Sequence, residues 1–170
     1  GTPASAAASY LQQVRNWVPA APVIHIDDSD VVKQDGYKFE SLGIVRDGSE
    51  STSTKNVYKK RYHVTEACVL TTSNHPVSIF SKIHSSAEKG YKSANVITFE
   101  AMEQGAALFK RATFCMDRGY DDNKMFLKLD DLEQDYVIRL TSKRKLLYHN
   151  KWTPATELRD RRKGKIKTSV

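Results

Sequence analysis

Two acidic clusters in the sequence each follow a largely apolar run, an arrangement in which carboxylates could bind a divalent cation. The first cluster, residues 27–30, follows residues 23–26, and the second begins at Asp117 after residues 112–116. Ligand and catalytic groups in open α/β sheets collect at the carboxyl ends of strands, so these carboxylates converge if the two strands are neighbours. Asp is also common after strands as a turn former or helix cap, and that alternative stays open at this point.

Carboxylates held on a rigid sheet edge suit Mg²⁺ or Mn²⁺, which are hard cations that prefer oxygen ligands. Two such ions, roughly 3.5–4 Å apart, can activate a water or a 3′-hydroxyl and stabilise the leaving oxygen of a phosphodiester. Neighbouring ionised carboxylates repel each other, so such a site is unfavourable without a cation. The residue types are therefore compatible with metal-dependent phosphoryl transfer.

The elements that would position these clusters follow from hydrophobic periodicity and turn signals. Helical spacing predicts three helices, at residues 9–17, 95–111 and 122–133. Ser9 is expected to cap the first of these helices, and Asp121 or Asp122 the last. Runs rich in β-branched and aromatic residues predict strands at residues 23–30, 57–72, 77–84, 112–116 and 135–141. The second and third of these strands form a hairpin through the turn residues 73–76.

The remaining segments carry weaker signals. Residues 1–9 are small and polar and are expected to fray, while residues 33–56 read as a long loop. Residues 146–152 could add a further strand. A hairpin followed by strands that alternate with helices predicts an α/β fold, in which helices pack on a mixed sheet.

The charge of the chain is concentrated at one end. The 170 residues carry a net charge of +7, with 27 Lys and Arg against 20 Asp and Glu. Residues 139–170 hold eleven Lys and Arg against two acidic residues, or +9, so the first 138 residues carry 16 against 18, or −2. A basic end on a near-neutral body indicates a polyanionic partner such as nucleic acid, or else a solubilising tail.

The cysteines and the hydropathy pattern bound the setting of the protein. Cys68 and Cys115 lie inside apolar runs and lack a Cys-x-x-Cys spacing, so we expect reduced thiols and no zinc site. No apolar run approaches the length of a membrane span, and no signal peptide is visible. These features predict a cytoplasmic protein that does not enter a membrane.

Several segments, taken in order, resemble the DDE-triad transposases of bacterial insertion sequences. The segments are VIHIDDSDVVK, LGIVRDGSE, IFSKIHSSAEKGYKSAN, DRGYDDNKMF and DYVIRLTSKRKLLY, and the likeness runs from about residue 23 to the C-terminus. DRGYD followed by YVIR at this spacing is the most specific part. The resemblance implies a ribonuclease-H-like mixed sheet flanked by helices, which cleaves transposon-end DNA and transfers the strand to target DNA.

The resemblance also implies roles for individual residues. In that fold the first catalytic Asp lies on the first strand and the second lies just after the fourth strand. Asp117 matches the second position; Asp28 matches the first, with Asp27 as its competitor, and strand alternation allows only one of these two to face the site. Asp28 and Asp117 would hold Mg²⁺ or Mn²⁺, and double-stranded DNA would meet the basic side chains of Arg118, Arg139, Lys143, Arg144 and Lys145.

The domain organisation implied by the resemblance has three parts. Residues 1–22 form an N-terminal segment, residues 23–142 the catalytic core, and residues 143–170 a basic segment that begins a β-rich insertion. The third catalytic residue, a Glu on a later helix, is not found, because Glu133 and Glu157 lie in the wrong places. We therefore expect a truncated chain that lacks this Glu and most of the DNA-binding region, taken from an enzyme that acts as a homodimer on DNA.

Three other interpretations stay open. The chain could be a catalytically incomplete remnant that binds DNA through its basic end, or another nuclease of the same fold. Lys143, Arg144 and Lys145 could equally form a solvent-exposed turn, and Arg139 or Arg118 could pair with a site carboxylate. A serine hydrolase is disfavoured because no Gly-x-Ser-x-Gly motif is present.

Overall fold

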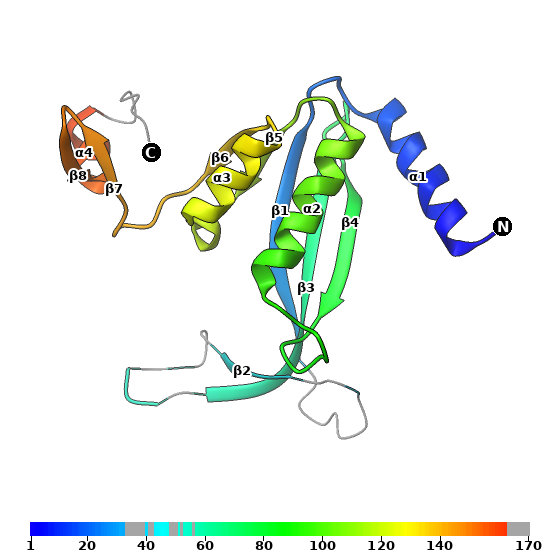
Figure 1. The fold of residues 1–170 in the computed structure, drawn as a ribbon, viewed down its shortest axis with the longest axis horizontal. Coiled ribbons are helices and arrows are strands. Elements are labelled where there is room, and N and C mark those ends of the chain that lie inside the picture. The colour runs from blue at the N-terminus through cyan, green and yellow to red at the C-terminus, as the bar shows by residue number, and fades with distance from the viewer. Residues whose placement is uncertain (33–39, 41–42, 48–50, 52, 56, 163–170) are drawn as a thin grey trace.

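The computed structural model describes residues 1–32, 40, 43–47, 51, 53–55 and 57–162 (Figure 1). The fold is a mixed α/β arrangement. Its helices are α1 (Pro3–Trp17), α2 (Ala94–Leu108), α3 (Asn123–Asp131) and α4 (Ala155–Arg162), with a 3₁₀ turn η1 (Arg118–Tyr120). Its strands are β1 (Val23–Val32), β2 (Gly43–Asp47), β3 (Val57–Leu70), β4 (Pro76–His84), β5 (Thr113–Met116), β6 (Asp135–Ile138), β7 (Lys145–Tyr148) and β8 (Lys151–Pro154).

A six-stranded mixed sheet forms the centre of the molecule. Its order is β2-β3-β1-β5-β6, and β4 pairs with β3 as well. The pairs β1–β3, β2–β3 and β3–β4 are antiparallel, whereas β1–β5 and β5–β6 are parallel. The first strand of the chain therefore lies in the middle of the sheet, between a hairpin strand and the strand that leads to Asp117.

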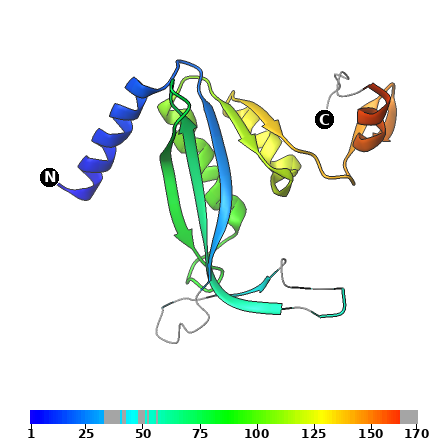
Figure 2. The same ribbon diagram turned by 180° about the vertical axis from the view of Figure 1, so that it is seen from behind.

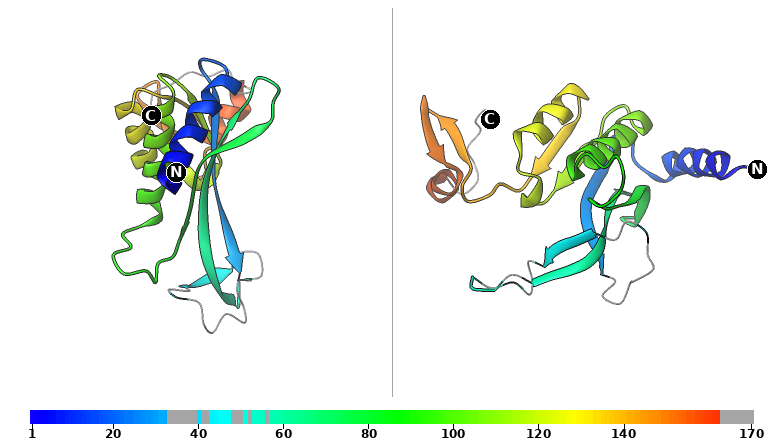
Figure 3. Two further views of the ribbon diagram at one scale, coloured as in Figure 1. Left: turned by 90° about the vertical axis from the view of Figure 1, so that its right-hand side faces the viewer. Right: turned by 60° about the horizontal axis from the view of Figure 1, so that its bottom comes forward.

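The helices α2 and α3 pack on the same face of this sheet (Figure 3). Ile24 and Phe114 are fully buried beneath α2, and Gly105 lets the helix approach them closely. On α3, Leu129 is fully buried and the Phe126 ring stacks on Tyr136 of β6, with ring centroids 5.8 Å apart. Burial of these apolar side chains fixes both helices against β1, β5 and β6.

The opposite face of the sheet is open. Figure 2 shows β1, β3 and β4 from this side, with no helix of the described residues in front of them. His25 on β1 is exposed, Cys115 on β5 is half-buried, and Val137 on β6 is 63% exposed. The free thiols Cys68 and Cys115 are direct cross-strand neighbours of His25 on either side. Their side chains are therefore half-exposed at the sheet surface.

The N-terminal helix differs from the sequence prediction. It begins at Pro3 rather than at Ser9, and residues 3–8 are helical instead of frayed. Thr2 is the N-cap, in a reciprocal capping box with Ser5, and Pro3 occupies the first helical position, where its missing N–H costs nothing. Val14 packs into the core and the Tyr10 hydroxyl donates to the Ser78 carbonyl at 2.8 Å. These contacts attach α1 to β4.

The segment after β6 is a small separate unit. Residues 146–152 were predicted to add one strand, but they form the hairpin β7–β8, which is not part of the main sheet. His149 and Asn150 both have positive φ, 48° and 60°, as a two-residue type I′ turn requires. The helix α4 follows this hairpin directly. Periodicity did not predict the helix, because its charged sequence lacks an apolar stripe apart from Leu158.

The other elements lie close to their predicted positions. The predicted hairpin is present as β3 and β4, and the predicted helix at 95–111 is α2. The predicted loop at 33–56 contains the short strand β2; much of the rest of that segment lies outside the described residues. No helix of the described residues is long and apolar enough to cross a membrane.

Candidate functional site

The two acidic clusters meet at one edge of the sheet. The strands β1 and β5 are parallel neighbours, in register from Val23 opposite Thr113 to His25 opposite Cys115, so Asp28 within β1 and Asp117 directly after β5 lie close together along the two strands. Both carboxylates line one cavity of about 330 Å³. The structure therefore brings together the two acidic residues that the sequence analysis singled out.

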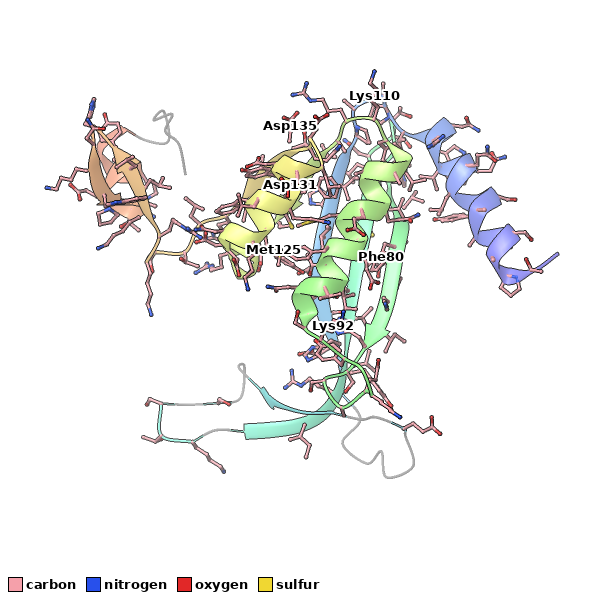
Figure 4. The ribbon with its side chains drawn as sticks, in the orientation of Figure 1. Phe80, Lys92, Lys110, Met125, Asp131 and Asp135 are labelled. Atoms are coloured by element: carbon pink, nitrogen blue, oxygen red, sulfur yellow. The ribbon has the colours of Figure 1, made fainter. Side chains whose placement is uncertain are left out.

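Three structural elements close the rest of this cavity. The first turns of α2 contribute Asn95 and Thr98, and η1 contributes Tyr120. Met125, which also lines the cavity, lies at the start of α3 between that helix and α2 (Figure 4). The cavity is thus a polar-walled space beside the middle of β1 and at the carboxyl end of β5, the end of a strand at which ligand sites of open α/β sheets are found.

Strand alternation separates Asp27 from Asp28. Ile24 and Ile26 are buried beneath the helices and His25 is exposed on the open face. Asp28 continues the phase of the two isoleucines, so it faces the helix-covered side, whereas Asp27 continues the phase of His25. Asp27 lines the 330 Å³ cavity too, but it also lines a second cavity of about 490 Å³ on the open face. Asp117 lines both cavities, so it shares one with Asp28 and both with Asp27; the preference for Asp28 rests on the resemblance.

Each of the two carboxylates is held by a neutral hydrogen-bond donor. The Thr65 hydroxyl donates to Asp28 Oδ1 at 2.5 Å, and it also lies 2.8 Å from Nε2 of the buried His84. Asp117 Oδ1 accepts the backbone N–H of Gly119 at 2.7 Å, which makes Asp117 the N-cap of η1. These bonds fix one oxygen of each carboxylate.

The charges of these carboxylates are not balanced by any cationic side chain in the described part of the chain. Among the residues that the structure describes, none of Asp27, Asp28 and Asp117 forms an ion pair, and all three are exposed toward the cavities. The fourth acid of the region is different, because Asp30 pairs with Arg61 and with His63 Nδ1, the latter at 2.7 Å. The cavity therefore concentrates negative charge that nothing in the described part of the chain neutralises.

The pKa of Tyr120 is affected by this negative charge. Its side chain is only 6% exposed, and its hydroxyl is a buried group without a hydrogen-bond partner of standard geometry. Burial raises the pKa of the Tyr120 phenol, and the charge of the nearby Asp28 carboxylate raises it further. Asp27 and Asp117 add smaller effects in the same direction. Three carboxylates thus act on a single phenol.

A cation would be held by only part of a complete ligand set. Within the described ranges, no three or more His, Cys, Asp or Glu side chains are grouped so that they could hold a metal ion. Asp28 and Asp117, both unpaired and both facing the same cavity, are oxygen donors of the kind that Mg²⁺ and Mn²⁺ use. The donor set fits such a cation as two of its protein ligands.

Two arginines extend the site away from the carboxylates. Arg118 and Arg139 are exposed, and within the described part of the chain neither forms an ion pair with Asp117 or with another acid. Both line a groove of about 400 Å³, together with Arg159 and the hydroxyl residues Thr141, Ser142 and Thr156. Arg139 also lines the open-face cavity that contains Asp27 and Asp117, so the basic groove and this cavity lie on either side of one arginine.

Arg144 behaves differently from its neighbours in the sequence. Its Nε donates to Asp121 Oδ1 at 2.7 Å, its Nη1 donates to Asn123 Oδ1 at 2.6 Å, and its guanidinium lies over the Phe126 ring. The Asp121 side chain is 1% exposed and also accepts two hydrogen bonds from Thr141. Arg144 therefore fastens the β7–β8 unit to the core, whereas Lys143 and Lys145 are exposed.

The sequence analysis did not single out Thr65, His84, Tyr120 or Asn95. Tyr120 lies inside the DRGYD motif, where the sequence indicates a turn and does not mark the tyrosine as a site residue. Thr65 and His84 lie in strands that carry no sequence motif. The hydrogen-bond chain that joins them to Asp28 depends on strand register, which the sequence does not show. Asp122, one of the two predicted caps, is confirmed as the N-cap of α3.

No model of a known protein family matches the chain, and no curated protein matches it either.

Proposed function

We propose that this chain is the core of a DNA transposase of the ribonuclease-H-like fold, which cleaves transposon-end DNA and joins it to target DNA with Mg²⁺ or Mn²⁺. The observation that carries the proposal is the pairing of Asp28 and Asp117 in one cavity. One lies on the first strand and the other directly follows β5, which is the fourth strand of the sheet if the short β2 is left out. This is the placement that the resemblance to DDE transposases implies.

The chemistry assigned to the site is phosphoryl transfer. A divalent cation bound by Asp28 and Asp117 would lower the pKa of an attacking hydroxyl and neutralise charge on the phosphate. The protein residues bind and orient: Thr65 and the Gly119 N–H hold one oxygen of each carboxylate. In such transfers the protein contributes mainly alignment and electrostatic stabilisation.

The basic groove supports DNA as the substrate. Arg118 and Arg139 carry charges that no described acid neutralises, and the groove they line opens beside the acidic edge. A DNA backbone lying in this groove would place a phosphate next to Asp117. Lys143 and Lys145 could extend the contact, while Arg144 is engaged with Asp121 and is left out of the proposed contact surface.

Mn²⁺ binding tests the proposed metal site on this chain. Electron paramagnetic resonance should show free Mn²⁺ disappearing on addition of the wild-type chain, and Asp28→Asn or Asp117→Asn should weaken that binding at least tenfold. Asp122→Asn is the matched control, because Asp122 caps α3 and lines neither acidic cavity. In the full-length protein, Asp117→Asn should abolish strand cleavage in Mg²⁺ or Mn²⁺; cleavage that survives contradicts the assignment.

A catalytically incomplete DNA-binding protein is the second candidate. It is favoured because, among the described residues, no three His, Cys, Asp or Glu side chains are grouped so that they could hold a metal ion. It predicts salt-dependent DNA binding that is unaffected by divalent ions and is not followed by nicking. A titration of DNA binding and nicking with Mn²⁺ separates the two candidates.

A further inference from the structure

A buried threonine and a buried histidine lie directly behind Asp28. Thr65 on β3 is the cross-strand neighbour of Asp28, and His84 is the last residue of β4. Thr65 is 0% and His84 1% exposed. Their contacts form a chain, with His84 Nε2 at 2.8 Å from Thr65 Oγ1 and Thr65 Oγ1 at 2.5 Å from Asp28 Oδ1. Asp28 is thus connected to the interior of the protein through one hydroxyl.

The protons in this chain have only one consistent arrangement. An ionised carboxylate can only accept, so the single Thr65 proton is donated to Asp28. The Thr65 oxygen must then accept a proton from His84 Nε2. His84 Nδ1 is buried and has no partner in the described part of the structure, as expected for the bare nitrogen of a neutral Nε2–H imidazole. The hydrogen bonds therefore all point from the interior toward Asp28.

The histidine itself is held in place by its neighbours. Its ring stacks between His63 and Tyr91, with centroid distances of 5.6 and 5.9 Å. Burial lowers the pKa of His84, and the charge of His63 lowers it further, which favours the neutral ring. A stacked, neutral imidazole is a hydrogen-bond donor with a fixed position, so it restricts the orientation of the Thr65 hydroxyl that accepts from it.

We propose that Thr65 and His84 are positioning residues, which hold Asp28 in a single rotamer with one oxygen bound to the protein and the other turned to the cavity. The inference rests on the proposed function, in which that second oxygen binds a divalent cation. Hydrogen bonds to the ligands of a metal fix their orientation, and removing such a bond typically weakens metal binding about 10–100-fold. Thr65 touches the proposed ligand, and His84 acts through Thr65.

Purely structural pairing of Thr65 with His84 is the competing explanation, and a set of variants separates the two. Thr65→Ser keeps the hydroxyl, whereas Thr65→Val removes it and leaves the His84 N–H buried without an acceptor. The double variant Thr65→Val/His84→Phe removes both polar groups and keeps the ring stacking, so it should fold even if the single variant does not. Thr153→Val is the control, because Thr153 is a buried threonine on β8 whose hydroxyl donates to the nearby Lys151 carbonyl.

Two measurements on the whole chain read the result. The three-bond N–Cγ and C′–Cγ couplings of Asp28 report its χ1 angle. They should show a single χ1 rotamer in the wild type and in the variants Thr65→Ser and Thr153→Val. In the double variant they should show averaging between rotamers. Mn²⁺ binding should weaken about tenfold or more in the double variant and stay within about twofold of wild type in the other two. Imidazole ¹⁵N shifts should show the Nε2–H tautomer of His84.

Each outcome decides one of the two proposals. A single Asp28 rotamer that persists in the double variant, or an Nδ1–H tautomer in the wild type, overturns the positioning role. Wild-type protein that binds no Mn²⁺ overturns the proposed metal site instead, while the rotamer measurement, which needs no metal, still decides whether Thr65 and His84 orient Asp28.

Discussion

Asp28 and Asp117 share a cavity in which, among described residues, no basic side chain pairs with either carboxylate. Their mutual repulsion disfavours the folded state in the absence of a cation. We therefore expect Asp117→Asn to raise the melting temperature in EDTA by roughly 1–3 °C, since the amide oxygen can still cap η1. The same variant should lose most of the increase in melting temperature that Mn²⁺ gives the wild type. Differential scanning calorimetry with and without Mn²⁺ measures both effects.

The control for this prediction is Asp122→Asn, which changes the same charge at the α3 cap, outside both acidic cavities. It should leave the Mn²⁺-dependent increase intact. If Asp117→Asn lowers the melting temperature in EDTA and keeps the Mn²⁺ effect, then Asp117 serves only as a cap.

Tyr120 should make the protein sensitive to alkaline pH. Burial and then the Asp28 carboxylate raise the pKa of the phenol above its ordinary value of 10.0 in the folded state. The stabilisation that this raised pKa gives the folded state is fully present below pH 10. It is lost as pH rises above 10, because the Tyr120 phenol of the unfolded chain then releases a proton that the folded protein retains. The free energy of unfolding should fall by up to about 1.4 kcal/mol per pH unit above pH 10. Urea unfolding at several pH values measures this slope.

Tyr120→Phe should remove most of that slope, and Tyr136→Phe a smaller part, since burial raises the pKa of the less enclosed Tyr136 as well. An unchanged slope in Tyr120→Phe would show that its phenol titrates normally and is not enclosed with the carboxylates.

Arg144 should matter for stability more than for DNA binding. Removing it leaves the nearly buried Asp121 without its cationic partner, so Arg144→Met should cost about 3 kcal/mol. Lys145→Met, one position along and exposed, should cost less than about 0.5 kcal/mol. A double-mutant cycle with Asp121→Asn, measured by urea unfolding, should show strong coupling; additive effects would contradict the ion pair.

The Asp121 contribution has a defined pH window. Burial alone would raise the pKa of this carboxyl, but the hydrogen bonds from Arg144 and Thr141 outweigh it and lower the pKa below the ordinary 3.8. A lowered pKa in the folded state stabilises the protein above pH 3.8, and this stabilisation is lost as pH falls through the lowered value. Arg144→Met should therefore flatten the acid limb of the stability curve.

Arg118 and Arg139 should contribute to DNA affinity through phosphate contacts. Each Arg→Gln variant should reduce the slope of log K against log salt by about 0.9, because one fewer counterion is released from the duplex. Lys110→Gln removes the same charge at the opposite end of the sheet and should leave the slope unchanged (Figure 4). Fluorescence anisotropy over a range of salt concentrations measures these slopes, and equal slopes for all three variants would exclude a localised contact surface.

The sequence could predict the parts of the fold that depend on local patterns. Acidic residues after two apolar runs marked both clusters, and the resemblance to DDE transposases selected Asp28 and Asp117 within them; their strands are parallel neighbours in the sheet. The long helix α2 and the β3–β4 hairpin also follow from periodicity. The ribonuclease-H-like assignment stays a proposal, because a mixed sheet with helices on it is compatible with other folds.

The contacts between distant segments could not be predicted from the sequence. The register of β3 against β4 shifts at a bulge between Ala67 and Cys68, and such a bulge reverses which side chains of the strand lie on each face of the sheet. The contact between Thr65 and His84 depends on that register. The Arg144–Asp121 pair was missed for a similar reason, because the run of basic residues at 143–145 looked uniform and only packing distinguishes its members.

The closest approach of α2 to the sheet gives the last prediction. A Cβ on Gly105 would lie 2.8 Å from Ile24 Cδ1 and 2.9 Å from Phe114 Cζ, both fully buried. Ala normally stabilises a helix interior by about 1 kcal/mol relative to Gly, but here the overlap should reverse the sign and cost about 1–3 kcal/mol. Ile24→Val removes the Cδ1 atom, so the double variant should be less destabilised than the sum of the two single variants. Urea unfolding of the four proteins measures this coupling, and a stabilising Gly105→Ala would mean that α2 lies farther from β1 and β5 than described, with the cavity beside its first turn correspondingly wider.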